Sequence, residues 1–243
     1  MDYSFLQCGE GALTVHLGDG IDPAINRRVT ALQGAIGSAG LRGITDLIPA
    51  YADLTVCYDC TVISAKALQR QLRRLLDSLS VAGQDRRRVF RLPVCYGGDY
   101  GPDLDFVCHH SGLSAQEVIA LHSAPDYLIY MLGFLPGFAY LGGLDPRLHT
   151  PRLDSPRTCI PAGSVGIGGA QTGVYPLASP GGWQLLGRTP VSVFDRQRQE
   201  PILYRAGDLV HFVPISHAEY EEIARAVAAG TYTVQVEEVP VCD

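Results

Sequence analysis

The sequence predicts an α+β domain over residues 1–90, followed by a β-barrel domain over residues 91–243. Two observations support this fold class. Strand-like runs alternate with two amphipathic helices before residue 97, whereas short apolar runs separated by Gly and Pro fill the region after residue 125. The composition, with 47% hydrophobic and 18% charged residues among 243, suits two domains that each bury a core.

Six elements are expected in the first domain. The two helices, at 21–38 and 64–79, each carry apolar side chains on one face; Asp22 is expected to cap the first, and Gly40 to end it. The strands are expected at 12–17, 44–48, 54–58 and 89–96. The order strand, helix, strand, strand, helix, strand is that of the ferredoxin-like split βαβ fold.

The second domain is expected to hold two short helices and then many short strands. The helices lie at 104–110 and 114–122, the second with a capping box of Ser114 and Glu117. The apolar runs are at 127–134, 159–160, 165–167, 173–175, 183–186, 191–194, 202–204 and 209–213. A helix at 216–228 and a strand at 231–239 follow. Many short strands with regular turns indicate a barrel-like domain.

Charge and composition argue against several classes of partner. The net charge is −6 and no basic stripe is visible, so we expect no nucleic acid partner. Residues 127–144 carry no charge, but Pro136 and four glycines interrupt them, so we expect no membrane span. The seven cysteines are irregularly spaced and the start lacks a signal-peptide pattern, which favours a cytoplasmic location with reduced thiols.

The strongest candidate for a binding site is the glycine-rich segment 158–187, which has no charged residue and no histidine. Glycines allow positive φ, and successive free N–H groups can bind an anion that flanking arginines would clamp. The candidate substrate- or anion-binding residues are Arg152, Arg157, Gly163, Ser164, Gly166, Gly168, Gly169, Gln171 and Arg188. The alternative is a set of tight barrel turns with salt-bridging arginines.

A second group of residues could belong to a site or to an interface: His149, Tyr175, Trp183 and Gln184. His149 could equally be a surface histidine, and Trp183, the only tryptophan, could be a core anchor or a pocket wall. Residues 130–140 are dense in aromatic side chains, which favours barrel interior or a rim that another subunit covers.

Three sharper motifs fail on residue chemistry. The spacing Gly163-x4-Gly168 suits a phosphate loop, but the required lysine is missing, and Lys66 is the only lysine in the chain. Ser164 lacks the strand, turn and helix of a nucleophile elbow. The pair Cys57-x2-Cys60 has no second pair of ligands, so we expect no metal site.

A series of short motifs carries a family resemblance from about Gly9 to Pro214. They are Leu92-Pro-Val-Cys-Tyr-Gly-Gly-Asp99, Leu132-Gly-Phe-Leu-Pro-Gly-Phe-Ala-Tyr-Leu141, the run from Pro161 to Pro176, Ser179-Pro-Gly-Gly-Trp-Gln184 and Gly187-Arg-Thr-Pro190. With these motifs the chain resembles the family of B-type 5-oxoprolinase subunits. That family also includes inhibitors of sporulation sensor kinases and proteins labelled allophanate hydrolase subunit 1.

The resemblance implies a cyclophilin-like β-barrel, related to a carboxyltransferase subdomain, and a heteromeric complex. The direct partner would be a C-type subunit, an A-type subunit would complete the activity, and the chain alone would be inactive. Such a complex hydrolyses 5-oxo-L-proline to L-glutamate with ATP and Mg²⁺ and has no covalently bound cofactor. The resemblance assigns no catalytic residue to this subunit. Two alternative roles stay open: inhibition of a sensor histidine kinase, and a urea- or allophanate-type carboxyltransferase subunit.

Overall fold

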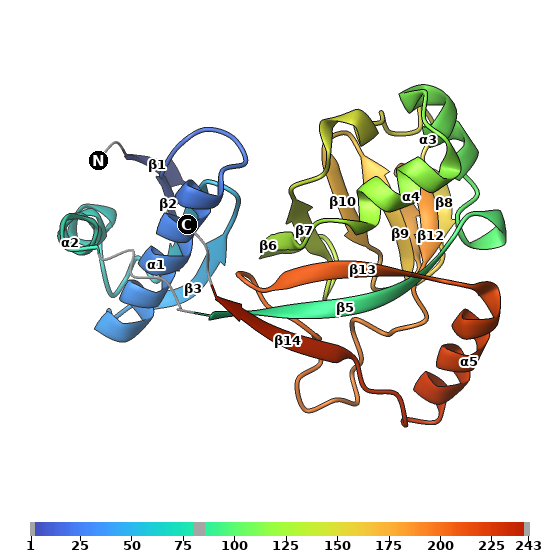
Figure 1. Ribbon diagram of the computed structural model, residues 1–243. Coiled ribbons are helices and arrows are strands. Elements are labelled where there is room, and N and C mark those ends of the chain that lie inside the picture. The colour runs from blue at the N-terminus through green and yellow to red at the C-terminus, as the bar shows by residue number, and fades with distance from the viewer. Residues whose placement is uncertain (1–2, 80–85, 241–243) are drawn as a thin grey trace. The chain divides into compact units, whose positions relative to one another are not determined.

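The structure is a computed structural model that describes residues 3–79 and 86–240. The chain divides into two compact units, Met1–Asp85 and Arg86–Asp243, coloured blue to cyan and green to red in Figure 1. Strand β5 (Arg86–Tyr96) runs through residues 90–91, the position at which the sequence divided the chain.

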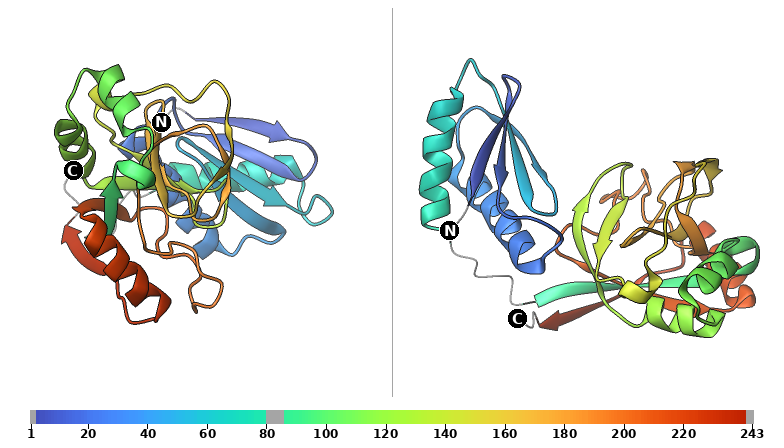
Figure 2. Two further views of the ribbon diagram at one scale, coloured as in Figure 1. Left: turned by 90° about the vertical axis from the view of Figure 1, so that its right-hand side faces the viewer. Right: turned by 90° about the horizontal axis from the view of Figure 1, so that it is seen from above.

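The first unit is a four-stranded antiparallel sheet with two helices. The strands are β1 (Ser4–Cys8), β2 (Ala12–His16), β3 (Ile44–Pro49) and β4 (Asp53–Tyr58), arranged in the order β1-β2-β4-β3. Helices α1 (Pro23–Ala39) and α2 (Ala65–Asp77) pack on one face of this sheet (Figure 2). Their buried side chains, including Leu32 and Leu72, share a core with Leu13 and Val56 of the strands.

Local signals explain where α1 begins and ends. The Asp22 carboxylate accepts a hydrogen bond from the backbone N–H of Ala24 at 2.6 Å, and Gly40 ends the helix with a left-handed φ of 56°. Both caps confirm the sequence prediction. The apolar stripe that contains Val29 and Ile36 faces the core, as the spacing of three and four residues required.

The prediction that the strand at 89–96 completes the ferredoxin-like sheet of the first domain is wrong. The run at 89–96 forms part of β5, which belongs to the second unit and pairs in parallel with β13 (Leu209–Ile215) from Val89 to Cys95. The edge position beside β2 is instead taken by β1, which the sequence analysis did not expect. Apolar periodicity defines a strand, but not the sheet that supplies its hydrogen-bond partners.

Seven strands of the second unit close into a barrel in the order β12-β9-β10-β7-β6-β13-β5, and β5 pairs back onto β12. The remaining barrel strands are β6 (Tyr127–Leu132), β7 (Ala139–Gly142), β9 (Ser164–Gly168), β10 (Gln171–Val174) and β12 (Gln184–Arg188). Strand β14 (Gln235–Pro240) pairs with the outer side of β5, and Figure 1 shows β13, β5 and β14 side by side. The structure therefore contains the expected barrel.

Shorter elements surround the barrel. They are η1 (Gly98–Tyr100), α3 (Leu104–Ser111), α4 (Ala115–Ser123), η2 (Pro146–Leu148), α5 (His217–Ala228) and a two-stranded ribbon of β8 (Arg157–Ile160) and β11 (Ser179–Gly181). The capping box of Ser114 and Glu117 is present as predicted. The runs expected at 191–194 and 202–204 form no regular strands, but an isolated bridge between Phe194 and Ile202 and a hydrogen bond from the N–H of Leu203 to the carbonyl of Val193 at 3.0 Å join them. Within residues 3–79 and 86–240, no helix has the length and apolar character needed to cross a bilayer.

Candidate functional site

A pocket of about 270 Å³ opens on the surface of the barrel unit. We call it the aromatic pocket. Its lining combines five aromatic rings, one arginine, two prolines and two glycines: Phe134, Phe138, Tyr140, Arg152, Pro156, Tyr175, Pro180, Gly181, Gly182 and Trp183. Three residues that the sequence analysis singled out, Arg152, Tyr175 and Trp183, thus meet at one site.

The aromatic walls are held by edge-to-face contacts around Phe138. Its ring centroid lies 5.5 Å from those of Phe134 and Tyr175, 5.1 Å from that of Tyr140 and 5.6 Å from that of Trp183. Such T-shaped pairs contribute roughly 0.5–1.5 kcal/mol each beyond the area that they bury. The walls are therefore preorganised.

Two glycines make room for these rings. A Cβ atom on Gly168 of β9 would overlap Nε1 of Trp183, and one on Gly181 would lie 2.6 Å from Oη of Tyr175. No L side chain fits at such separations, so both rings rest directly on backbone. The glycines of the motif thus shape the wall of the pocket.

Phe134 lies in a strained turn at the tip of the β6–β7 hairpin. Its φ of 60° is the only positive value of a non-glycine residue within residues 3–79 and 86–240. The N–H of Leu135 donates to the carbonyl of Gly133 at 2.6 Å, which closes a three-residue γ-turn around Phe134. Turns of this hand are rare, and left-handed backbone at a bulky residue costs about 1–3 kcal/mol. The side chain is 61% exposed.

Arg152 supplies the charge of the aromatic pocket. Its guanidinium carbon lies 6.0 Å from the centroid of Trp183, at the outer limit of a cation–π contact. Within the part of the chain that the structure describes, it has neither an ion-pair nor a hydrogen-bond partner. Burial raises the pKa of Tyr175, and the positive charges of Arg152 and Arg157 act in the opposite direction. The guanidinium is therefore available to a ligand.

The predicted anion-binding loop is instead a strand. Ser164 to Gly168 form β9, every residue of which is buried, and β9 pairs with β10 on one side and β12 on the other. Because these N–H groups face two neighbouring strands, they cannot form a nest for an anion. A Cβ on Gly166 would lie 2.7 Å from the carbonyl oxygen of Gln184, so close strand packing explains this glycine.

The turns on either side of β9 are also occupied by backbone contacts. The N–H of Gly163 donates to the carbonyl of Tyr175 at 2.7 Å, and that of Gly169 donates to the carbonyl of Thr150 at 2.8 Å. The Ser164 hydroxyl is fully buried and has no hydrogen-bond partner among the described residues, so no substrate reaches it. Gln171 begins β10 and is half-buried.

Arg157 does not join Arg152 at the pocket. Its Nη2 donates to Asp103 Oδ1 at 2.6 Å, and its Nη1 donates to the carbonyl of Trp183 at 3.3 Å. The other oxygen of Asp103 accepts from the N–H of Leu185 at 2.6 Å. Arg157 therefore ties the start of α3 to β12, which is the salt-bridging role that the sequence analysis had kept as its alternative.

Arg188 lies in a different cluster, beside η1 and α5. Its guanidinium carbon is 5.5 Å from the ring centroid of Tyr100, and it interacts with Tyr220. The rings of Tyr100 and Tyr220 are 4.2 Å apart, and the Tyr100 hydroxyl donates to Glu221 at 2.7 Å. The three arginines of the predicted clamp thus belong to three separate environments.

The two remaining candidates flank the pocket without lining it. Gln184 is buried and donates from Nε2 to the carbonyl of Pro151 at 3.0 Å, which holds the backbone just before Arg152. His149 is exposed at the end of η2. Phe134, Phe138 and Tyr140 line the pocket but were not among the candidates, although the aromatic density of residues 130–140 indicated them.

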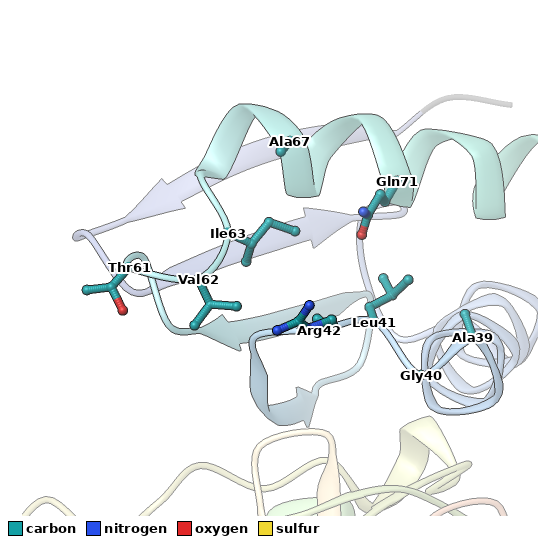
Figure 3. A pocket seen from close by; sticks show the side chains of 9 residues that line it. All are labelled: Ala39, Gly40, Leu41, Arg42, Thr61, Val62, Ile63, Ala67 and Gln71. Carbon is teal, nitrogen blue, oxygen red and sulfur yellow. The ribbon is translucent and has the colours of Figure 1, made fainter.

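The first unit has a larger and shallower pocket of about 610 Å³ (Figure 3). Its walls come from the end of α1, the turn before α2 and α2 itself: Ala39, Gly40, Leu41, Arg42, Thr61, Val62, Ile63, Ala67 and Gln71. Gln71 Oε1 is buried there and has no hydrogen-bond partner in the described ranges. No aromatic ring lines this pocket, and none of the sequence candidates falls in it.

The residues at the glycine-rich segment do not fit ATP. The backbone N–H groups of β9 are engaged in the barrel, and no lysine follows the glycines. Across residues 3–79 and 86–240, no three His, Cys, Asp or Glu side chains are grouped to hold a metal ion. We therefore assign no step of nucleotide chemistry to this segment.

Comparison with known proteins agrees with this architecture. Residues 3–204 match the family model described as carboxyltransferase domain, subdomain C and D. The chain is thus a protein of the carboxyltransferase C-and-D-subdomain class. A relative from Bacillus subtilis (strain 168), described as the B-type subunit of 5-oxoprolinase, is 42% identical over 228 residues, which cover 90% of this chain and 95% of the relative. The chain belongs to the family of B-type 5-oxoprolinase subunits.

Two solved structures extend the comparison. A crystal structure of a longer chain is 41% identical with a TM-score of 0.75; the match covers 84% of this chain, which spans 40% of that one. The crystal structure of Kluyveromyces lactis urea carboxylase has a TM-score of 0.81 at 23% identity and covers 98% of this chain, which spans 24% of the enzyme. The second likeness shows a shared fold.

Proposed function

We propose that this chain is the B-type subunit of an ATP-dependent 5-oxoprolinase complex, which hydrolyses 5-oxo-L-proline to L-glutamate. The observation that carries the proposal is the 42% identity to a B-type 5-oxoprolinase subunit over nearly the full length of both chains. The open aromatic pocket, with Arg152 in its wall, supports a ligand-binding role for this chain.

The chemistry explains why such a reaction consumes ATP. The lactam of 5-oxoproline is an unstrained, resonance-stabilised amide and a poor electrophile. Phosphoryl transfer from ATP to its carbonyl oxygen would make the carbonyl carbon electrophilic enough for water to add. The ring C–N bond would then break with the nitrogen leaving as the protonated amine, and a second water would hydrolyse the resulting acyl phosphate to glutamate and phosphate. Because the glycine-rich segment of this chain does not fit phosphates, we assign ATP and Mg²⁺ to a site formed largely by the partner subunits.

The proposal includes two partners and a location. A C-type subunit would bind this chain directly, and an A-type subunit would complete the activity in the cytoplasm. In two solved structures the region that matches this chain makes up only 40% and 24% of a longer polypeptide. The same fold thus occurs there joined covalently to further sequence, which is compatible with this chain working together with other subunits. The barrel is proposed to be cyclophilin-like, and that fold alone implies no isomerase activity.

The test is an omission experiment. The chain is mixed with its A-type and C-type subunits, ATP and Mg²⁺, and glutamate release from 5-oxo-L-proline is measured with and without this chain. We expect release only from the complete mixture. Equal release without this chain would overturn the proposal.

The family model favours one second candidate, a carboxyltransferase acting on urea or allophanate. The same mixtures, supplied with urea, bicarbonate and a biotinylated carrier in place of 5-oxoproline, distinguish the two. Consumption of urea that depends on this chain, without glutamate release from 5-oxoproline, would establish the second candidate instead.

A further inference from the structure

Arg152 has the features of a ligand-binding arginine rather than a structural one. It is the only charged residue among the ten that line the aromatic pocket. Arg157, five residues later, is held at 2.6 Å by Asp103, whereas Arg152 has no such partner in residues 3–79 and 86–240. Arg152 is exposed, so its guanidinium is accessible to a carboxylate from solution, with which it can form a charge-assisted hydrogen bond.

The lining and the volume of the aromatic pocket indicate the size and the shape of the ligand. Five aromatic rings line the pocket together with Arg152, whose guanidinium carbon lies 6.0 Å from the ring centroid of Trp183, and Gly181 and Gly182 add backbone without side chains to the lining. The volume of about 270 Å³ lies just below the range of about 300–1,000 Å³ typical of drug-sized ligands. One small ring that bears a carboxylate therefore matches both the charge and the space.

We propose that the aromatic pocket binds a small cyclic amide that bears a carboxylate, with Arg152 pairing with the carboxylate and Trp183 packing against the ring. This inference rests on the proposed function, because it names 5-oxo-L-proline as the member of that class. Its ring is nearly flat at the amide, which suits packing against an aromatic face.

Phe134 is the residue that we expect to tune ring specificity. It keeps a bulky side chain in a left-handed γ-turn and leaves 61% of it exposed at the pocket. Strain retained at the rim of a pocket is a recognised mark of function. A bound ring would cover Phe134 and offset the exposure of its apolar surface.

Trp183 provides the readout, because it is the only tryptophan of the chain and forms a wall of the pocket. The full-length chain is titrated with 5-oxo-L-proline while tryptophan emission is recorded. We expect a saturable change whose Kd rises about 10- to 100-fold in Arg152→Ala and partly recovers in Arg152→Lys, since losing a charge-assisted hydrogen bond has this effect. Arg225→Ala, which removes an exposed arginine of α5, should bind as the unmodified chain does.

The neutral lactam 2-pyrrolidinone lacks the carboxylate and is the matched ligand control. We expect it to bind at least about 10-fold more weakly than 5-oxo-L-proline and to be insensitive to Arg152→Ala. Phe134→Ala should weaken the binding of both ligands to a similar extent, because it removes an aromatic side chain from the pocket wall and leaves the charge of Arg152 in place.

The inference is overturned if 5-oxo-L-proline produces no saturable change, or if Arg152→Ala binds it with the unmodified Kd. Its failure is distinguishable from that of the proposed function. Glutamate release that requires this chain, combined with no effect of Arg152 on binding, would leave the subunit assignment standing and remove only the pocket. Carboxylate-selective binding without any glutamate release would leave the pocket standing and remove the subunit assignment.

Discussion

His122 shows how a single buried side chain is kept neutral inside the barrel unit. Its ring is completely buried and stacks on Phe212 with centroids 4.8 Å apart. Nδ1 lies 2.8 Å from the hydroxyl of Tyr96, and Nε2 lies 2.7 Å from that of Thr172. Burial lowers the pKa of His122 to about 3, because desolvation disfavours the charged imidazolium.

This lowered pKa predicts a pH dependence of stability. The unfolded chain binds a proton at His122 below about pH 6.5, whereas the folded chain does not until about pH 3. Stability from this group is thus fully present above pH 6.5 and is lost as the pH falls, at up to about 1.4 kcal/mol per pH unit. The free energy of unfolding measured from pH 7.5 to 5 should fall more steeply for the natural chain than for His122→Gln. Parallel curves would contradict this account.

The arginines show what residue type can and cannot predict. Arg152, Arg157 and Arg188 were equal candidates in the sequence, because a guanidinium near a glycine-rich segment suits a clamp or a salt bridge alike. The partner decides the role, and Asp103, which pairs with Arg157, lies 54 residues away along the chain. A contact of that sequence separation follows from the fold and cannot be found in local spacing.

Different partners predict different stabilities for two alanine variants. Arg157→Ala leaves the largely buried Asp103 without its cation and should lower the free energy of unfolding by about 1–3 kcal/mol, or roughly 2–12 °C in Tm. Arg152→Ala breaks no ion pair among the described residues and should stay within about 0.5 kcal/mol. Thermal unfolding of both variants checks this. A Tm loss in Arg152→Ala equal to that of Arg157→Ala would show that Arg152 is structural.

At the scale of elements, hydrophobic periodicity and capping predicted the helices well. Both caps of α1 and the capping box of α4 lie where Asp, Gly, Ser and Glu indicated. Strands were harder, because β1 is mostly exposed and β9 contains glycines that suggest a loop. In β9 the glycines serve close packing against β12 and Trp183, a reason that only the neighbouring strands reveal.

Gly168 tests this explanation of β9. A Cβ there would overlap the indole nitrogen of Trp183, so Gly168→Ala must displace the ring or the strand. We expect a loss of about 1–3 kcal/mol in the free energy of unfolding, typical of overpacking, and a shift of the tryptophan emission. Gly169→Ala is the control, because a Cβ at this turn meets nothing within 4 Å, although its φ of 66° adds modest backbone strain. An unchanged emission spectrum in Gly168→Ala would contradict the packing role.

At the scale of the whole molecule, the composition and the series of short strands predicted two units and a barrel. The closure of seven strands, with β5 pairing to β13, β12 and β14, could not be predicted, because it depends on pairings between distant segments. The aromatic pocket follows from that closure. It brings the β6–β7 hairpin, the segment around Arg152 and the β11–β12 turn to one place.

The aromatic pocket is central to the proposed role of this chain, because Arg152 is assigned there to the substrate carboxylate. The most direct test is steady-state kinetics of the reconstituted complex with 5-oxo-L-proline, comparing the natural chain with Arg152→Ala. We predict that KM rises about 10- to 100-fold while kcat changes little, because the lost contact binds substrate and transition state alike. An unchanged KM in the Arg152→Ala complex would contradict this assignment.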